Sequence, residues 1–564
     1  AESIKEVPSE LQAIVSKLKA LTERLSIQAL PQPWLPPLEK EIFLQDLRPA
    51  GFEEMWGTGK LSTEFILGMV DLPSQQDQQL VRHNFNEDGN LALFSSPGMG
   101  KSTFLQSMVM DLARHKTPEQ VQFYLFDFGT NGLLPLTKLP HIADHLSVDS
   151  DEKLVKVIPI IRDEVTRRKK LFGQYVASNI GMYVESSGES MSQIVLVIDG
   201  YDGIKEAKNS EALESLFLTL SRDGASLGIY LAITASRTGA IRPALLTNIK
   251  QRLTLKMSDD TEARSIVGRT SLVIEDLPGR GLIPMDQPEL LQIALPSYGE
   301  NSIQMIHNLK VEIDRMDRSW KGNRPKKIPI VPEVLSVEQF KRILEPMKEQ
   351  ASNQIPLGLD LIDVEPVWIS LEKMKHLVVL GDQRDSIKGA LTHILMGTSA
   401  FSQGVHTLVV DGQSEYSVYQ SKVGTYINGD HVAKLLPNML QELESRKQHP
   451  KTKHSLILIP DLAEFIEIVS PKLEDFTVLF NEGPRYGLHF VFGSQKSSLF
   501  KTDSVIKLVK ENIDTALVVQ RLYDQTVLAH KETSREATLA KDEVYLYQNN
   551  QYVKTKIIHS KEWR

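Results

Sequence analysis

A run of small residues with one lysine, SSPGMGKST at 95–103, is the first place where residue types and spacing could do chemistry. The run follows an apolar segment, LALF, and precedes KSTFLQSMVMDLARH, whose apolar residues recur at helical spacing. Small residues at a strand-to-helix turn let backbone N–H groups surround phosphate oxygens, and a helix N-terminus favours negative charge. The run therefore predicts a P-loop that binds a nucleoside triphosphate.

Each residue of this loop has an expected task. Lys101 would reach the β- and γ-phosphates, and the hydroxyl of Ser102 would bind Mg²⁺. The strict pattern GxxxxGK[ST] has glycine where this chain has Ser95, but the central GMGKS is intact. The alternative, an ordinary turn with an incidental lysine, does not account for the flanking elements. The predicted nucleotide-binding residues are Ser95, Ser96, Pro97, Gly98, Met99, Gly100, Lys101, Ser102 and Thr103.

A P-loop needs an acidic partner for Mg²⁺ at the end of a buried strand, and IVLVID supplies Asp199. ATPases of this type commonly carry a glutamate directly after that aspartate to polarise the attacking water, whereas this chain has Gly200. Asp202 either takes over that role or merely caps a turn. We therefore expect ATP to be bound with Mg²⁺ and hydrolysed slowly.

The elements that must hold these residues alternate in type along the chain. Short β-rich runs alternate with longer helical stretches, which predicts an α/β fold with a mainly parallel sheet covered by helices on both faces. A leading amphipathic helix is expected within residues 1–30, where Ser9 and Gln12 form a capping-box pattern. The β-rich runs are LALFS (91–95), QFYLFD (122–127), IVLVID (194–199) and IYLAIT (229–234).

The second half of the chain repeats the first. FILGMVDLPS and IPLGLDLIDV place Gly68 and Gly358 at the same point, and four further segment pairs follow in the same order. A basic, Gly- and Pro-containing stretch near 320–328 reads as a linker. We therefore predict two homologous domains, residues 31–322 and residues 323–564.

The loop of the second domain is damaged. GDQRDSIKG keeps Gly381 but has Ser386 and Ile387 where glycine and lysine belong, and Asp385 would repel a phosphate. We expect little or no triphosphate binding there. Asp461 is interpreted as the counterpart of Asp199. The two halves also differ at the end of one strand, where the second has Gln495 and the first has Ser236.

Composition excludes several classes of protein. At 564 residues, 41% hydrophobic and 24% charged, the chain is neither disordered nor fibrous and can form several domains. A net charge of −8 provides no global attraction to nucleic acid or anionic lipid, and the basic cluster RRKK at 167–170 is expected on a solvated helix face. Without cysteine there is no disulfide or thiolate metal site. No apolar run approaches the ~18 residues of a membrane span, so we expect any anchor outside this chain.

Several longer motifs resemble a known family. PWLPPL, DFGTNGL with LPH, RRKKLFGQYVASNIGMY, VIDGYD, SRDGASLGIYLAITASR, and IKQRLTLKMSDDTEARSIVGR with LPGRGL are similar to segments of FtsK/SpoIIIE-like ATPases. More narrowly, the chain from about residue 30 to 560 resembles the C-terminal tandem ATPase domains of the EssC/EccC motors of type VII secretion systems. The resemblance implies two tandem RecA-like P-loop domains behind a short N-terminal helix.

The resemblance also implies a functional setting. These motors are membrane-anchored and hexamer-forming, with ATPase domains at the cytoplasmic face of the membrane, and they export WXG100-type proteins together with other secretion components. Lys101 and Ser102 match the P-loop residues of the family, and Asp199 matches its Walker B aspartate. Arg222 falls where these motors carry an arginine that completes a neighbour's site in trans; the alternative is a solvated arginine at a helix end.

The resulting functional hypothesis assigns a task to each domain. The first would bind Mg·ATP and the second would recruit substrate, without nucleic acid and without membrane contact by this chain. Two alternatives stay open. One is a DNA translocase of the FtsK/SpoIIIE type, and the other is an inactive, nucleotide-regulated adaptor.

Overall fold

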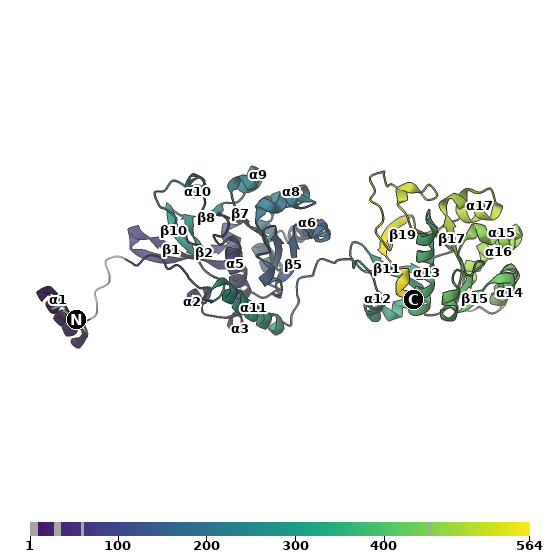
Figure 1. Cartoon of the computed structure of the whole chain (residues 1–564), viewed down its shortest axis with the longest axis horizontal. Coiled ribbons are helices and arrows are strands. Elements are labelled where there is room, and N and C mark those ends of the chain that lie inside the picture. The colour runs from purple at the N-terminus through teal and green to yellow at the C-terminus, as the bar shows by residue number, and fades with distance from the viewer. Residues whose placement is uncertain (1–8, 28–34, 58–60, 451–452, 564) are drawn as a thin grey trace, which may run out of the picture. The chain divides into compact units, whose positions relative to one another are not determined.

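The computed structural model describes residues 9–27, 35–57, 61–450 and 453–563, and the chain divides into two compact units, residues 1–328 and 329–564 (Figure 1). The division falls after Ile328 rather than after residue 322, because the preceding segment is tied to the first unit. Lys327 Nζ donates a hydrogen bond to the carbonyl of Ile142 at 2.9 Å, and the N–H of Ile328 donates to Asp144 at 3.0 Å.

The leading helix α1 (Glu10–Arg24) begins with the expected capping box. The Ser9 hydroxyl accepts a hydrogen bond from the N–H of Gln12, whose side chain accepts one from the N–H of Ser9. All side chains of α1 are exposed. The cap therefore starts this helix without any help from a core.

The first unit contains a ten-stranded sheet in the order β2-β1-β10-β9-β8-β3-β7-β6-β4-β5. The six strands from β8 to β5 are parallel to one another, and the other four extend the sheet in antiparallel fashion. The four predicted runs are β3, β4, β6 and β7, at the centre of the parallel part. The strands are β1 (Glu64–Leu72), β2 (Asp77–Asn84), β3 (Leu91–Phe94), β4 (Val121–Asp127), β5 (Ile142–Ser147), β6 (Gln193–Asp199), β7 (Ile229–Ala235), β8 (Gln251–Leu255), β9 (Arg280–Pro284) and β10 (Pro288–Ile293).

Helices cover both faces of this sheet. The long helix α5 and helices α3 and α11 bury their apolar side chains on one face, and α6, α7 and α8 bury theirs on the other. The mainly parallel, two-sided arrangement predicted from the sequence is confirmed. The helices are α2 (Leu44–Leu47), α3 (Phe52–Met55), α4 (Phe85–Asp88), α5 (Lys101–His115), α6 (Asp151–Gln174), α7 (Ile180–Ser187), α8 (Ser210–Asp223), α9 (Pro243–Thr247), α10 (Asp260–Val267) and α11 (Ser302–Ser319).

The second unit has the same strand order, β12-β11-β20-β19-β18-β13-β17-β16-β14-β15. Helices α12 and α13 cover one face of its sheet, and α14 to α17 cover the other. Its strands are β11 (Gln354–Asp360), β12 (Pro366–Ser370), β13 (Leu377–Gly381), β14 (Val405–Val410), β15 (Thr425–Ile427), β16 (His454–Ile459), β17 (Leu488–Gln495), β18 (Thr515–Val518), β19 (Glu543–Gln548) and β20 (Gln551–Lys556). Its helices are α12 (Val337–Leu344), α13 (Arg384–Phe401), α14 (Leu435–Gln448), α15 (Leu462–Val469), α16 (Leu473–Glu482) and α17 (Ser504–Glu511).

Two glycines show how closely the halves correspond. Gly68 in β1 and Gly358 in β11 both follow a register shift against the neighbouring antiparallel strand. A Cβ on Gly68 would lie 1.9 Å from the carbonyl oxygen of Gln292, and one on Gly358 would lie 2.1 Å from that of Lys556. Only glycine permits this approach of two backbones, so the repeat preserves a structural requirement.

The basic cluster RRKK lies on α6 and is only partly solvated, which corrects the expectation for one of its members. Arg168 is 1% exposed and donates hydrogen bonds to Glu164 and to the carbonyls of Leu227 and Ser192. Arg167 is exposed and donates hydrogen bonds to both oxygens of Glu164. Arg168 thus joins α6 to the segments that lead into β6 and β7.

Candidate nucleotide site

The loop between β3 and α5 has the backbone of a phosphate cradle. Gly98 (φ 79°) and Gly100 (φ 107°) take left-handed conformations, and a Cβ on Gly98 would meet nothing within 4 Å. Ser95 is buried and has no positive φ, so serine in place of glycine leaves the loop unstrained. The loop is held from outside by hydrogen bonds from the N–H of Ser96 to Lys256 O and from the N–H of Gly279 to Met99 O.

Lys101 is the first residue of α5, and its side chain folds across the loop. Nζ donates hydrogen bonds to the carbonyls of Ser95 at 2.8 Å and Ser96 at 3.1 Å. Burial lowers the pKa of Lys101, and the negative charges of Asp199 and Asp202 partly oppose this shift. The ammonium group is therefore already held at the cradle, where phosphate oxygens can replace the two carbonyls.

Ser102 and Asp199 meet in the structure, as the predicted Mg²⁺ ligands must. Ser102 Oγ donates to Asp199 Oδ2 at 2.6 Å, and Thr234 Oγ1 donates to Asp199 Oδ1 at 2.6 Å. Burial raises the pKa of Asp199 and the charge of Asp127 adds to the rise, whereas both hydrogen bonds lower it. A hydroxyl and a carboxylate are hard oxygen ligands that suit Mg²⁺, which keeps the remainder of its shell as water and phosphate oxygen. The residues present fit a Mg·ATP site.

Asp202 lies close to this site, but its carboxylate is already hydrogen-bonded to Ser236. It belongs to a 3₁₀ turn (Tyr201–Glu206) and accepts hydrogen bonds from the N–H of Ser236, at 2.8 Å, and from its hydroxyl. The exposed carboxylate thus joins the turn after β6 to the end of β7.

Arg222 lies near the amino ends of the parallel strands, whereas the P-loop lies at their carboxyl ends. It is exposed near the end of α8, before β7 begins, whereas the P-loop follows the end of the parallel strand β3. It lines an open hollow together with Asn90, Asn248 and Lys250. Among the described residues no ion pair holds Arg222. The chain does not bring it to its own nucleotide site.

Asp127 is a site residue that the sequence reasoning missed. It ends β4 and pairs in register with Asp199 at the end of β6. The segment that follows it crosses the site, since a Cβ on Gly132 would lie 2.6 Å from Ser102 Oγ. Gln106 of α5 holds this segment by donating to Gly132 O. The available signal was an aspartate at the end of a buried run, QFYLFD, which is the same signal that identified Asp199.

Strand register corrects the assignment of Asp461. Asp199 follows Ile198 in β6, and Pro460 follows Ile459 in β16; the two isoleucines pair with equivalent residues of the next strand, Ile233 and Phe492. Pro460 therefore occupies the position of Asp199, and Asp461 occupies that of Gly200. The sequence-based assignment matched the two segments on their aspartates, whereas the register matches them on their apolar runs, which end at Ile198 and Ile459.

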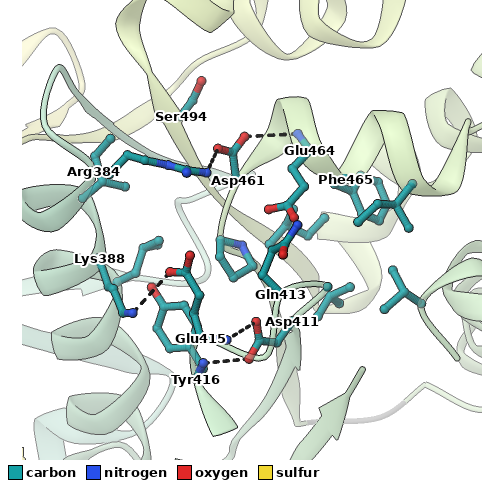
Figure 2. A pocket seen from close by; sticks show the side chains of 18 of the residues that line it. Arg384, Lys388, Asp411, Gln413, Glu415, Tyr416, Asp461, Glu464, Phe465 and Ser494 are labelled. Atoms are coloured by element: carbon teal, nitrogen blue, oxygen red, sulfur yellow. Dashed lines mark hydrogen bonds and ion pairs between the residues drawn. The ribbon is translucent and has the colours of Figure 1, made fainter. Parts of the chain in front are cut away.

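A pocket lies where the second unit would hold a nucleotide. Figure 2 shows its two ion pairs, Arg384 with Asp461 at 3.1 Å and Lys388 with Glu415 at 3.2 Å. Four carboxylates line the pocket against these two cations, so the cations are not free for phosphate and the lining repels a triphosphate. The carboxylates are Asp411, Glu415, Asp461 and Glu464. Gln495, which also lines this pocket, donates a hydrogen bond to the carbonyl of Asp382 in the damaged loop.

Fold and site together define the class of protein: two homologous P-loop ATPase-type domains in tandem, with the phosphate cradle and the predicted magnesium ligands in the first. The FtsK/SpoIIIE family model matches residues 52–280. These residues form a domain of the FtsK/SpoIIIE family, and the chain has the tandem ATPase architecture of the EssC/EccC proteins.

Similar proteins extend this match over nearly the whole chain. The type VII secretion system protein EssC of Staphylococcus aureus strain MRSA252 is 31% identical over 562 residues, which is 99% of this chain and 38% of that protein. The solved structure of EssC ATPases 2 and 3 from Geobacillus thermodenitrificans is 27% identical, with a TM-score of 0.82 over 93% of this chain and 100% of that one. Thermomonospora curvata EccC ATPases 2 and 3, solved with a signal sequence peptide, share the fold at 20% identity and a TM-score of 0.55, over 93% of this chain and 99% of that one. This chain spans about two fifths of the curated relatives' length. Within its described part, no helix is both long and apolar enough to cross a membrane.

Proposed function

We propose that this chain is an ATP-binding motor segment of a type VII protein secretion system, located at the cytoplasmic face of the membrane. The observation that carries the proposal is the hydrogen bond between Ser102 and Asp199 beneath an intact P-loop with Lys101 in place. Relatives that match nearly the whole chain are named type VII secretion system protein EssC and ESX secretion system protein YukB, which supports the biological setting. The first unit binds Mg·ATP through residues 95–103, with Ser102 and Asp199 as the protein's ligands for Mg²⁺.

Hydrolysis by the isolated chain is slow in this proposal. Position 200 is glycine, position 236 is serine, and both oxygens of Asp202 already bind Ser236. Arg222, at the edge of the unit away from its own P-loop, acts on the nucleotide of a neighbouring copy in a hexameric ring of the full-length protein. A guanidinium supplied in trans stabilises charge on the transferring phosphoryl group.

The second unit recruits the exported substrate, a WXG100-type protein, and does not turn over nucleotide. Its phosphate ligands are missing, a proline stands at the magnesium-ligand position, and its two pocket cations are neutralised. The solved EccC ATPases with a signal sequence peptide, which share this fold, make peptide recognition by such tandem units a reasonable assignment. Removal of residues 329–564 is expected to abolish binding of a secreted substrate and to spare binding of Mg·ATP.

Calorimetric titration of Mg·ATP into the chain and into Lys101→Ala tests the nucleotide assignment. We expect one site, lost in the variant, because Lys101 is the cation at the cradle. Absence of binding to the wild type would favour an inactive adaptor, and a site that survives Lys101→Ala would place nucleotide in the second unit. Duplex DNA is the control ligand, since strongly salt-dependent binding would instead indicate a DNA translocase.

A further inference from the structure

Position 200 has no room for the glutamate that ATPases of this type commonly carry there. Gly200 has a left-handed φ of 64°, and a Cβ on it would lie 3.0 Å from the backbone N and Cα of Gly129. A side chain at this position would displace the segment that follows β4. A carboxylate that acts on the attacking water must therefore come from another element.

Asp127, two residues before Gly129, brings a carboxylate to this place. Its side chain is 0% exposed. Oδ2 accepts a hydrogen bond from the N–H of Leu133 at 2.9 Å and lies 3.3 Å from Nε2 of His145. Oδ1 is buried and has no hydrogen-bond partner among the described residues. A buried carboxylate oxygen without a hydrogen-bond partner destabilises the fold. Its presence therefore indicates that a bound ligand supplies the missing donor.

The free oxygen faces the magnesium ligands. A Cβ on Gly129 would lie 4.0 Å from Asp127 Oδ1 and 3.8 Å from Asp199 Oδ2, so both oxygens border the space that this glycine leaves open. Asp199 Oδ2 is the oxygen that accepts the hydrogen bond from Ser102. Asp127 Oδ1 thus lies beside the predicted magnesium site.

The second unit supplies an internal comparison. Strand register makes Asp411 the counterpart of Asp127 and Tyr426 the counterpart of His145. Asp411 Oδ1 accepts from the N–H of Glu415, and Oδ2 accepts from the N–H of Tyr416 and the hydroxyl of Tyr426 (Figure 2 shows the two N–H bonds). Both units therefore use this aspartate to hold the loop after the strand, but only the unit with a P-loop leaves one of its oxygens free.

We propose that Asp127 is a catalytic residue of the first unit, whose Oδ1 accepts the hydrogen bond of the water that attacks ATP, with His145 as a positioning residue. The water oxygen forms a bond to the γ-phosphorus, the bond from that phosphorus to the β–γ bridging oxygen breaks, ADP and phosphate leave, and the proton of the water passes to Asp127. His145 holds Oδ2 and so directs Oδ1 toward the open space. This inference rests on the proposed function, binding and slow hydrolysis of Mg·ATP by the first unit.

The test compares Asp127→Asn with the wild type in two measurements on the full chain. Calorimetry with Mg·ATP measures binding, and a single-turnover assay measures hydrolysis. Asparagine retains an acceptor for the N–H of Leu133 but has no carboxylate, so we expect a dissociation constant within about threefold and a rate lower by about 100-fold or more. Trapping of Mg·ADP with aluminium fluoride, a binding measurement without turnover, should fail in Asp127→Asn and succeed in the wild type.

Three further variants separate this role from others. Asp411→Asn removes the equivalent carboxylate from the unit without phosphate ligands and should leave the hydrolysis rate unchanged. His145→Ala should lower the rate without weakening Mg·ATP binding, and His145→Gln, which retains a donor, should restore part of it. Asp202→Asn tests the rival carboxylate, and a loss of hydrolysis confined to that variant would overturn the proposal.

Each remaining outcome is decisive. Unchanged hydrolysis by Asp127→Asn, or loss of its Mg·ATP binding, would show that Asp127 is not the residue that acts on water. A wild type that binds Mg·ATP but neither hydrolyses it nor traps aluminium fluoride would overturn the inference and leave the nucleotide assignment intact. A wild type that binds no Mg·ATP would instead refute the proposed function, and this inference with it.

Discussion

The hydroxyl of Ser102 donates a hydrogen bond of 2.6 Å to Asp199 Oδ2, although the two residues are 97 positions apart in the chain. Ser102 is in the first turn of α5, and Asp199 is the last residue of β6. The contact requires β3, the strand before α5, and β6 to end at the same edge of one parallel sheet. The sheet thus places the two predicted metal ligands within hydrogen-bond distance of each other.

Ser102→Ala is expected to remove the dependence of ATP binding on Mg²⁺. The variant loses one metal ligand and the partner that orients Asp199, so ATP affinity in Mg²⁺ should fall by at least about 10-fold, toward the affinity in EDTA. Calorimetric titrations of ATP in Mg²⁺ and in EDTA measure these two affinities. Ser107→Ala is the matched control, because its hydroxyl is on the same helix but donates to Ala294 O, away from the site. An unchanged effect of Mg²⁺ on Ser102→Ala would exclude this residue as a ligand.

Arg222→Ala should separate binding from hydrolysis. Arg222 lies at the edge of the sheet opposite the P-loop, so the dissociation constant of Mg·ATP for the isolated chain should stay within about twofold of the wild type. In an assembled ring, hydrolysis should fall by about 10³-fold, as expected for a guanidinium supplied in trans. Lys250→Ala, in the same hollow, is the control and should leave hydrolysis nearly unchanged. Weaker nucleotide binding by the isolated Arg222→Ala chain would contradict the trans assignment.

Arg168→Met should destabilise the first unit much more than Arg167→Met. Arg168 is buried and donates to Glu164 and to backbone carbonyls, so its loss should lower the free energy of unfolding by about 3 kcal/mol. Arg167 pairs with the same glutamate but is 53% exposed, so its loss should cost less than about 1 kcal/mol. Hydrogen exchange of peptides from α6 measures the loss of unfolding free energy in each of the two variants. Equal effects would mean that the backbone hydrogen bonds of Arg168 contribute little.

The second unit should lose stability as the pH falls below 6.5, because it buries neutral histidines. Burial lowers the pKa of His376 to about 3; its Nε2–H donates to Phe480 O and its Nδ1 accepts from the N–H of Phe490. The folded-state pKa is below the unfolded value, so the contribution is complete above pH 6.5 and is lost as pH falls toward 3. The slope is about 1.4 kcal/mol per pH unit for each such group. His393 and His489, with pKa values lowered to about 4, add to it.

His376→Gln tests this contribution directly. The variant should reduce the pH dependence of the unfolding free energy between pH 6.5 and 4.5 by about 1.4 kcal/mol per pH unit. Hydrogen exchange of peptides from β17, corrected for intrinsic rates, reports on the second unit separately. The exposed His307, replaced by glutamine, is the control and should leave the slope unchanged. An unchanged slope in His376→Gln would show that this histidine does not titrate with unfolding.

The sequence by itself determined the fold class, the repeat and the P-loop, because these features depend on local patterns. Alternation of apolar runs with amphipathic segments specifies strands and helices, and the left-handed turns at Gly98 and Gly100 follow from residue type. The capping box at Ser9 and Gln12 is likewise a matter of spacing along one helix, and it forms as predicted.

Only the tertiary structure decided which side chains share a space, because strand register and burial depend on residues far apart in sequence. Register fixed Pro460 at the position of Asp199 and brought Asp127 beside Asp199. Burial separated Arg168 from its charged neighbours, although all four residues of RRKK look alike in sequence. Whether a carboxylate oxygen, such as Oδ1 of Asp127, lacks a hydrogen-bond partner depends on every residue packed around it, and only the folded chain places those residues.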